Sequence, residues 1–258
     1  DSSTSRGLGD VYKRQYPVRA PYVVLACGGL GGLYKNSTNF PHIAGDGLGI
    51  AMKHQVVLEH LDYIQIHPTT LYSHKPGRRF LISESVRGEG ALLYDKNGQR
   101  FTNELQPRDL LSQAIFAQME KDGTDFVWED MRPLGEETIM KHFPNIFHRC
   151  VEEGFDPRKE PIPVVPAQHY FMGGIKVDLG SRTSMKGLYA CGETSCNGVH
   201  GKNRLASNSL LESLVFARRA ADDIIFGRKP DPCRPGSIDL KPYEDRDAVL
   251  TVYHEMVL

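Results

Sequence analysis

The segment Val199–Glu212, V-H-G-K-N-R-L-A-S-N-S-L-L-E, most constrains how this chain can fold. Beyond it, apolar residues recur at helical spacing as far as Ile225, and Gly227 can end the predicted helix. Ser209 and Glu212 have the spacing of a capping box, which predicts that the helix begins there. A helix start behind a basic loop can bind an anion such as pyrophosphate or a carboxylate. An ordinary capped helix behind a solvated arginine is the equally weighted alternative.

The composition excludes several classes of protein. The net charge is -1 over 258 residues, and no Lys/Arg run is dense enough for a nucleic-acid or membrane-surface patch. No apolar run approaches the roughly 20 residues that span a bilayer. The 5 cysteines are odd in number and form no C-x-x-C motif. They predict free thiols and a reducing, cytoplasmic compartment.

A glycine-rich run follows the first predicted strand. Residues 22–26 form a short apolar run, typical of a strand buried on both faces, and Gly28–Gly32 come directly after it. Glycines in that place let the backbone pass close to a ligand. However, neither this run nor any other segment matches G-x-G-x-x-G, so the usual dinucleotide cradle is not encoded in this chain. Asp46, between two glycines, is equally a turn residue or a contact for a sugar or ring edge.

The remaining segments predict ordinary elements. Residues 124–162 read as a helical surface region without chemistry, and residues 173–178 are expected to pair with residues 188–190 across a turn. A further helix is predicted to begin near Tyr243. Residues 1–15 have almost no apolar side chains and predict a disordered or non-native arm.

Two histidines and one arginine stand where predicted elements begin or end. His67 precedes a proline, which favours extended geometry, and is expected at the end of a strand over residues 63–66. His169 lies near the end of the proline-rich extended segment 161–170. Arg108 follows a proline at the predicted start of a helix, where a cation opposes the helix dipole at a cost of about 0.3–1 kcal/mol. An arginine kept there is a mild indication that it is needed for another purpose.

The polar residues at predicted strand ends and helix starts share an anion-binding character. They are His67, Ser83, Glu84, Arg87, Arg108, His169 and Arg204. Guanidinium groups match carboxylates with two parallel hydrogen bonds, so the set favours a dicarboxylate with one clamp at each end. A metal site is less favoured because the histidines have no ligand spacing, and a serine hydrolase because no G-x-S-x-G occurs.

Seven motifs carry a resemblance. They are G-D-G at 45–47, Q-I-H-P-T at 65–69, S-E-S-V-R-G-E-G at 83–90, P-R-D at 107–109, H-Y-F-M-G-G-I at 169–175, G-L-Y-A-C-G-E at 187–193 and H-G-K-N-R-L-A-S-N-S-L-L-E at 200–212. In order and spacing the chain resembles the succinate dehydrogenase/fumarate reductase flavoprotein superfamily over about residues 21–230. Within it the chain is most similar to the L-aspartate oxidases, since succinate dehydrogenases usually carry a glycine pair where Ala206 and Ser207 stand. The run L-I-S-E-S-V at 81–86 points the same way.

The resemblance implies an α/β fold with an α+β capping domain. A partial FAD-binding Rossmann-like domain would then be combined with a fumarate reductase-type capping domain. The implied segments are a disordered or non-native arm over 1–15, part of the FAD-binding domain over 16–55, the capping (substrate) domain over 56–170, a return to the FAD-binding domain over 171–230, and the start of a C-terminal helical region over 231–258.

The resemblance also implies an activity. Non-covalent FAD would oxidise L-aspartate to iminoaspartate, with oxygen or fumarate as electron acceptor. In this family the reaction is the first step of de novo NAD biosynthesis, and quinolinate synthase, which takes the product, is a possible partner. A succinate dehydrogenase or fumarate reductase flavoprotein subunit is the near alternative. A non-catalytic dicarboxylate- or flavin-binding module is the alternative of another class.

Motif positions assign roles by resemblance. Contacts to the flavin or its ribityl chain fall to Asp46, Glu193, Ser209 and Leu210. One substrate carboxylate falls to His67, Ser83 and Glu84, and the other to His169 and Arg204. Arg108 resembles the family's proton-transfer arginine. Because a guanidinium is a weak acid near neutral pH, the proton relay could also include Glu84, Glu89 and Arg87. Ser83 stands where many relatives have Thr, and its hydroxyl keeps the contact.

The family's N-terminal glycine fingerprint is expected in sequence that this chain does not contain. Expressed alone, the chain is therefore expected to bind FAD weakly or not at all and to be inactive, because the group that grips the ADP half is absent. Gel filtration after incubation with FAD, read by flavin absorbance, checks this. Flavin that co-elutes with the chain at stoichiometric amounts contradicts the expectation.

Overall fold

The computed structural model describes residues 18–227 and 239–257, which form two compact units. Of the described residues, unit 1 contains 18–29, 45–62, 172–227 and 239–257, and unit 2 contains 30–44 and 63–171. The predicted arm over residues 1–15 lies outside the described residues. Residues 30–44 cluster with unit 2 because the backbone of Asn36 and Thr38 bonds to Gln168. The assignment of the units to a cofactor domain and a substrate domain stays a prediction.

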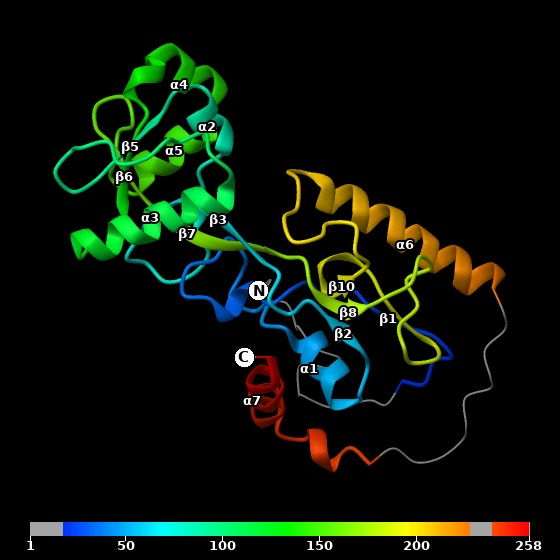
Figure 1. Ribbon diagram of the computed structural model, residues 1–258. Coiled ribbons are helices and arrows are strands. Elements are labelled where there is room, and N and C mark those ends of the chain that lie inside the picture. The colour runs from blue at the N-terminus through cyan, green and yellow to red at the C-terminus, as the bar shows by residue number, and fades with distance from the viewer. Residues whose placement is uncertain (1–17, 228–238, 258) are drawn as a thin grey trace. The chain divides into compact units, whose positions relative to one another are not determined.

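Unit 2 is built on a five-stranded sheet in the order β4-β3-β7-β6-β5, with antiparallel neighbours throughout. Its strands are β3 (Ile64–Leu71), β4 (Phe80–Leu81), β5 (Leu92–Tyr94), β6 (Val127–Asp130) and β7 (Ile162–Phe171). Its helices are η1 (Gly31–Leu33), α2 (Glu84–Gly88), α3 (Arg108–Asp122), η2 (Arg132–Leu134), α4 (Glu136–His142) and α5 (Pro144–Glu152). α3 packs along β3 and β7 (Figure 1). One apolar core joins the sheet to α3, α4 and α5 through residues such as Leu93, Ile115, Ile139 and Ile162.

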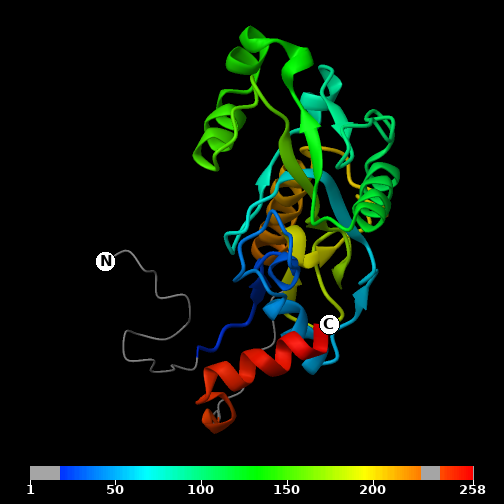
Figure 2. The ribbon, with the colours of Figure 1, turned by 90° about the vertical axis from the view of Figure 1, so that its left-hand side faces the viewer.

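Unit 1 contains a two-stranded parallel sheet, β1-β9, and a three-stranded sheet, β10-β8-β2. Its strands are β1 (Val23–Leu25), β2 (Leu58–Glu59), β8 (Gly174–Lys176), β9 (Leu188–Ala190) and β10 (Ser195–Cys196). Its helices are α1 (Asp46–Lys53), η3 (Gly192–Thr194), α6 (Asn208–Phe226), η4 (Lys241–Tyr243) and α7 (Arg246–Val257). α7, drawn red in Figure 2, lies beside α1, and Tyr253 packs on Gly49. A parallel strand pair with helices in unit 1 and an antiparallel sheet with helices in unit 2 confirm the predicted combination of α/β and α+β parts.

Several local predictions were wrong. Val23 and Val24 of β1 are 48% and 44% exposed rather than buried on both faces, because among the described residues β1 pairs only with β9. The expected pairing of residues 173–178 with 188–190 is replaced by β8 pairing with β10 and β2. The region 124–162 contains the inner strand β6 as well as helices, so it is not only a helical surface.

The part of the chain that the structure describes has no helix long and apolar enough to cross a membrane. In the same residues there is no cluster of three or more metal-ligating side chains. Cys150, Cys191 and Cys196 are free and buried, and Cys27 is free and exposed. These free thiols agree with the sequence prediction.

Candidate active site

The pairing of β3 with β7 positions both predicted histidines. His67 pairs with Ala167, and the register shifts between His67 and Thr70. Pro68 and Pro166 lie at this irregularity because a proline cannot donate a ladder hydrogen bond. β3 continues to Leu71, so the prediction that the strand ends at His67–Thr69 was wrong. The rings of His67 and His169 meet edge to face, with centroids 5.4 Å apart.

His67 is a buried, uncharged imidazole. Burial is the main reason that its pKa lies well below the usual value, and the nearby His169, Arg108 and Arg87 lower it further. Its Nδ1 lies 2.9 Å from the carbonyl oxygen of Thr69 and 3.2 Å from the Thr69 amide nitrogen. A neutral imidazole carries one N–H. Only the tautomer in which Nδ1 accepts from the Thr69 amide leaves an Nε2–H that can donate to a carboxylate.

His169 is held by Thr38, a residue that sequence reasoning missed. Thr38 Oγ1 lies 2.8 Å from His169 Nδ1. The adjoining Gln168 anchors this contact, because its Oε1 accepts from Ser37 Oγ at 2.7 Å and from Asn39 Nδ2 at 3.0 Å. The polar run Ser37–Asn39, directly after the glycine-rich segment, was the available signal. The contact with Thr38 fixes the orientation of the His169 ring.

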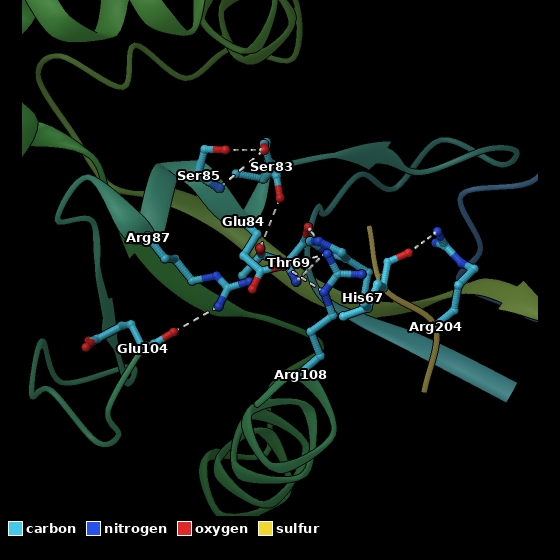
Figure 3. Close-up of polar contacts among 11 residues, drawn as sticks. His67, Thr69, Ser83, Glu84, Ser85, Arg87, Glu104, Arg108 and Arg204 are labelled. Atoms are coloured by element: carbon cyan, nitrogen blue, oxygen red, sulfur yellow. Dashed lines mark hydrogen bonds and ion pairs between the residues drawn. The ribbon is translucent and has the colours of Figure 1, made fainter. Parts of the chain in front are cut away.

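Arg108 and Glu84 form the charged centre of unit 2 (Figure 3). Arg108 is the first residue of α3, as predicted, and its Nε and Nη2 donate to Glu84 Oε2 at 2.7 and 2.5 Å. The carboxylate offsets the cost of a cation at the start of a helix. Arg108 Nη1 is buried and has no hydrogen-bond partner among the described residues. A donor of that kind is available to a substrate or to a proton relay.

The residues around Glu84 complete this group. Ser83 caps α2, and its Oγ accepts from the Ser85 amide at 3.3 Å. Arg87 is buried and donates through Nη1 to the carbonyl oxygen of Glu104 at 2.9 Å. Glu89 instead lies 2.8 Å from His142 Nδ1, so its carboxylate is engaged elsewhere.

The predicted cofactor residues all lie in unit 1. Asp46 begins α1, and its Oδ1 lies 2.7 Å from His254 Nε2 on α7. Glu193 lies in η3 against the glycine-rich segment that follows β1, where a Cβ on Gly29 would come within 2.5 Å of its Oε1. Arg204 is buried and donates through Nη1 to its neighbour's carbonyl, Leu205 O, at 3.1 Å (Figure 3).

The start of α6 corrects the capping-box prediction. α6 begins at Asn208 after Ser207, which has φ 65° and makes no side-chain cap hydrogen bond. Ser209 is therefore inside the first turn, and the Glu212 carboxylate is taken by Asn197 and Ser213 instead of capping the helix.

The structure thus divides the predicted residues into two groups. His67, Ser83, Glu84, Arg108 and His169 share unit 2, and Asp46, Glu193, Arg204, Ser209 and Leu210 share unit 1. The unit 1 group fits part of FAD: α6 begins without a side-chain cap next to Ser209, and Leu210 in its first turn is 72% exposed. The Glu193 side chain lies close to the backbone at Gly29, so a larger residue there would displace its carboxylate.

Comparison with known proteins defines the class. The family described as FAD binding domain matches residues 10–210, and the chain belongs to this family. An L-aspartate oxidase of Clostridium perfringens is 56% identical over 80% of this chain and 47% of its own length. An L-aspartate oxidase of Clostridium acetobutylicum is 52% identical over 81% of this chain and 48% of its own. The chain thus spans about half the length of the curated relatives it matches.

Solved structures of two further proteins share the fold. An E. coli quinol fumarate reductase chain matches with a TM-score of 0.72 and 36% identity, over 91% of this chain and 43% of that one. Mycobacterium smegmatis Sdh1 matches with a TM-score of 0.74 and 35% identity, over 90% of this chain and 40% of its own. The predicted resemblance to the superfamily is confirmed.

Replacing Thr38 by Val is expected to release His169. The Thr38 hydroxyl makes the hydrogen bond to Nδ1, so without it the ring should lose its fixed tautomer while the fold is kept. Nitrogen-15 NMR of the imidazole measures the change, and Thr38→Ser, which keeps the hydroxyl, is the matched control. An unchanged His169 spectrum in Thr38→Val would show that another contact orients the ring.

Proposed function

We propose that this chain is part of an FAD-dependent enzyme that oxidises L-aspartate to iminoaspartate, with oxygen or fumarate as electron acceptor. The observation that carries the proposal is the group in unit 2, where uncharged His67 lies beside His169 and a buried Arg108 donor has no partner. The names of the relatives that are 56% and 52% identical support the same substrate.

The substrate's two carboxylates would be bound at different places. His67, through Nε2–H, with Ser83 and the backbone at the start of α2, would hold one of them. Glu84 contributes there by keeping Arg108 in place through its two hydrogen bonds. His169, oriented by Thr38, would hold the other together with Arg204. Fixing both ends sets the position of C2, which is how orientation accelerates a reaction.

Oxidation of an amine to an imine removes a hydride from C2 and a proton from the nitrogen. FAD, held by Asp46, Glu193, Ser209 and Leu210, would supply the hydride acceptor that no side chain can provide. The proton would leave through Arg108 to Glu84, whose carboxylate oxygen is already bonded to the guanidinium. Arg87 lies close enough to influence this pair electrostatically and would stabilise the charge on Glu84.

The cellular setting follows from the same proposal. The reaction would be the first step of de novo NAD biosynthesis, and its unstable imine product would pass to quinolinate synthase. We expect the enzyme to work in the cytoplasm, although an Oryza sativa relative, 44% identical, is named chloroplastic.

A second candidate is a succinate dehydrogenase or fumarate reductase flavoprotein subunit. The fumarate reductase and Sdh1 structures, at 36% and 35% identity, favour it as the nearest rival because the same dicarboxylate clamps would serve. A non-catalytic dicarboxylate- or flavin-binding module is less well supported, because binding alone does not need an arginine that pairs with a carboxylate and keeps a buried donor without a partner among the described residues.

Replacing Arg108 by Leu in the full-length enzyme is expected to lower turnover of L-aspartate by roughly 10²–10⁴-fold, the usual contribution of a positioned acid–base group. Flavin absorbance should persist, because Arg108 lies outside the group assigned to the cofactor. Arg132→Leu is the matched control, since Arg132 also forms a fork with a carboxylate, that of Asp130, but outside the proposed site. Full turnover in Arg108→Leu with bound flavin would remove Arg108 from the mechanism.

A further inference from the structure

The inner strand β6 carries a fully buried carboxyl group, that of Glu129. Its side chain is 0% exposed and lies in the sheet between Leu93 of β5 and Ile162 of β7. It shares a face of the strand with Val127, a member of the apolar core. Neither carboxyl oxygen has a hydrogen-bond partner among the described residues. A buried polar group in this condition is costly and calls for a reason.

Arg87 is the complementary group. Its Nε and Nη2 are buried and also have no hydrogen-bond partner among the described residues, while Nη1 is bonded to Glu104 O. Glu129 exerts the largest effect of any charged group on Arg87, and Arg87 exerts the largest on Glu129. Two unsatisfied donors therefore lie near two unsatisfied acceptors, the set that a forked arginine–carboxylate pair uses.

The titratable groups that interact with Glu129 come from α2, from the segment before α3 and from α5. Arg87 is on α2, the Glu104 carboxylate precedes α3, and the Cys150 thiol on α5 has its pKa raised to about 12 by burial and then by Glu129. The paired segment of β7, Ile162–Val164, offers no titratable group. Burial raises the pKa of Glu129 to about 8, with Arg87 opposing and Glu104 adding to the rise.

We propose that Glu129 is a buried proton-binding residue that selects the partner of Arg87. While Glu129 is protonated, the Arg87 guanidinium keeps its hydrogen bond to the Glu104 carbonyl oxygen, and the positive charge of Arg87 acts on Glu84. When Glu129 releases the proton to solvent, its carboxylate takes Arg87 as a forked ion pair through Nε and Nη2. No other group changes its covalent state in this exchange.

The consequence for catalysis rests on the proposed function. Arg87 acts on Glu84, and Glu84 holds Arg108, so the ionisation of Glu129 would weaken the support of the proton-transferring pair. Glu129 is thus a positioning residue that acts through Arg87. It gives the site a proton-linked response on the alkaline side.

The direct test is infrared spectroscopy of the chain carrying ¹³C-labelled glutamate, recorded as a function of pH. A protonated-carboxyl band should disappear around pH 8 and should be missing in Glu129→Gln. In Arg87→Gln its loss should move to higher pH, because the cation now lowers the pKa of Glu129. Arg132→Gln, which removes the partner of the next residue on β6, should leave the band in place. A band that persists in Glu129→Gln, or an unshifted titration in Arg87→Gln, overturns the proposal.

Stability gives a second measurement with a defined sign. The folded chain keeps the Glu129 proton up to about pH 8, whereas the unfolded chain loses it near 4.5. The wild type therefore loses stability as pH rises through this window, and Glu129→Gln should become progressively more stable relative to it. Asp130→Asn should behave in the opposite sense, because the pKa of Asp130 is lowered overall. Burial raises that pKa, but the hydrogen bonds from Arg132 lower it by more. Glu129→Asp serves if the Gln variant does not fold, and it should retain a titrating band.

The pH dependence of turnover distinguishes a failure of this proposal from a failure of the proposed function. In the full-length enzyme, turnover by Glu129→Gln should keep its neutral-pH value further into the alkaline range than the wild type. If the infrared titration and its Arg87 dependence are found but L-aspartate is not oxidised, the proposed function falls and the Glu129–Arg87 pair stands. If L-aspartate is oxidised but Glu129 does not titrate, the pair falls alone.

Discussion

The antiparallel pairing of β3 with β7 is the constraint on which unit 2 depends. The pairing brings together residues about a hundred positions apart in the chain, and its irregular register at Pro68 and Pro166 places His67 against His169. Burial in this pairing keeps His67 uncharged, which makes it a hydrogen-bond donor to carboxylates and not a competing cation. The segment around Thr38 attaches to the same strand, so one backbone pairing sets both rings.

The second constraint is the burial of cations beside carboxyl groups. Arg108 forms an ion pair with Glu84. Arg87 donates to the carbonyl oxygen of Glu104 and interacts electrostatically with Glu129. A buried guanidinium is stable only where its donors find acceptors. In unit 2 they are only partly satisfied, since Arg108 Nη1 and two atoms of Arg87 have no partner among the described residues. Hydrogen-bond donors that have no partner in this way suit a site that must accept a substrate and move a proton.

Helix starts and ends could be predicted from the sequence because they depend on local signals. Arg108 begins its helix as expected, and Gly123 and Gly227 follow their helices. The sequence did not predict long-range strand pairing, such as that of β8 with β2 and β10. It also did not predict the strand β6, because four residues carry too little periodicity to be distinguished from a helical surface. For the same reason Glu129 was missed. The capping box at Ser209 failed because a left-handed residue at Ser207 starts the helix earlier.

The proposed function requires the unit 2 residues to select an amino dicarboxylate and to support its oxidation. The most direct measurement is the initial rate of flavin reduction in the full-length enzyme without air, with L-aspartate and with succinate at equal concentrations. Rapid reduction by L-aspartate and little or none by succinate is predicted. Rapid reduction by succinate, with L-aspartate inert, would contradict the account and place the chain with the dehydrogenases.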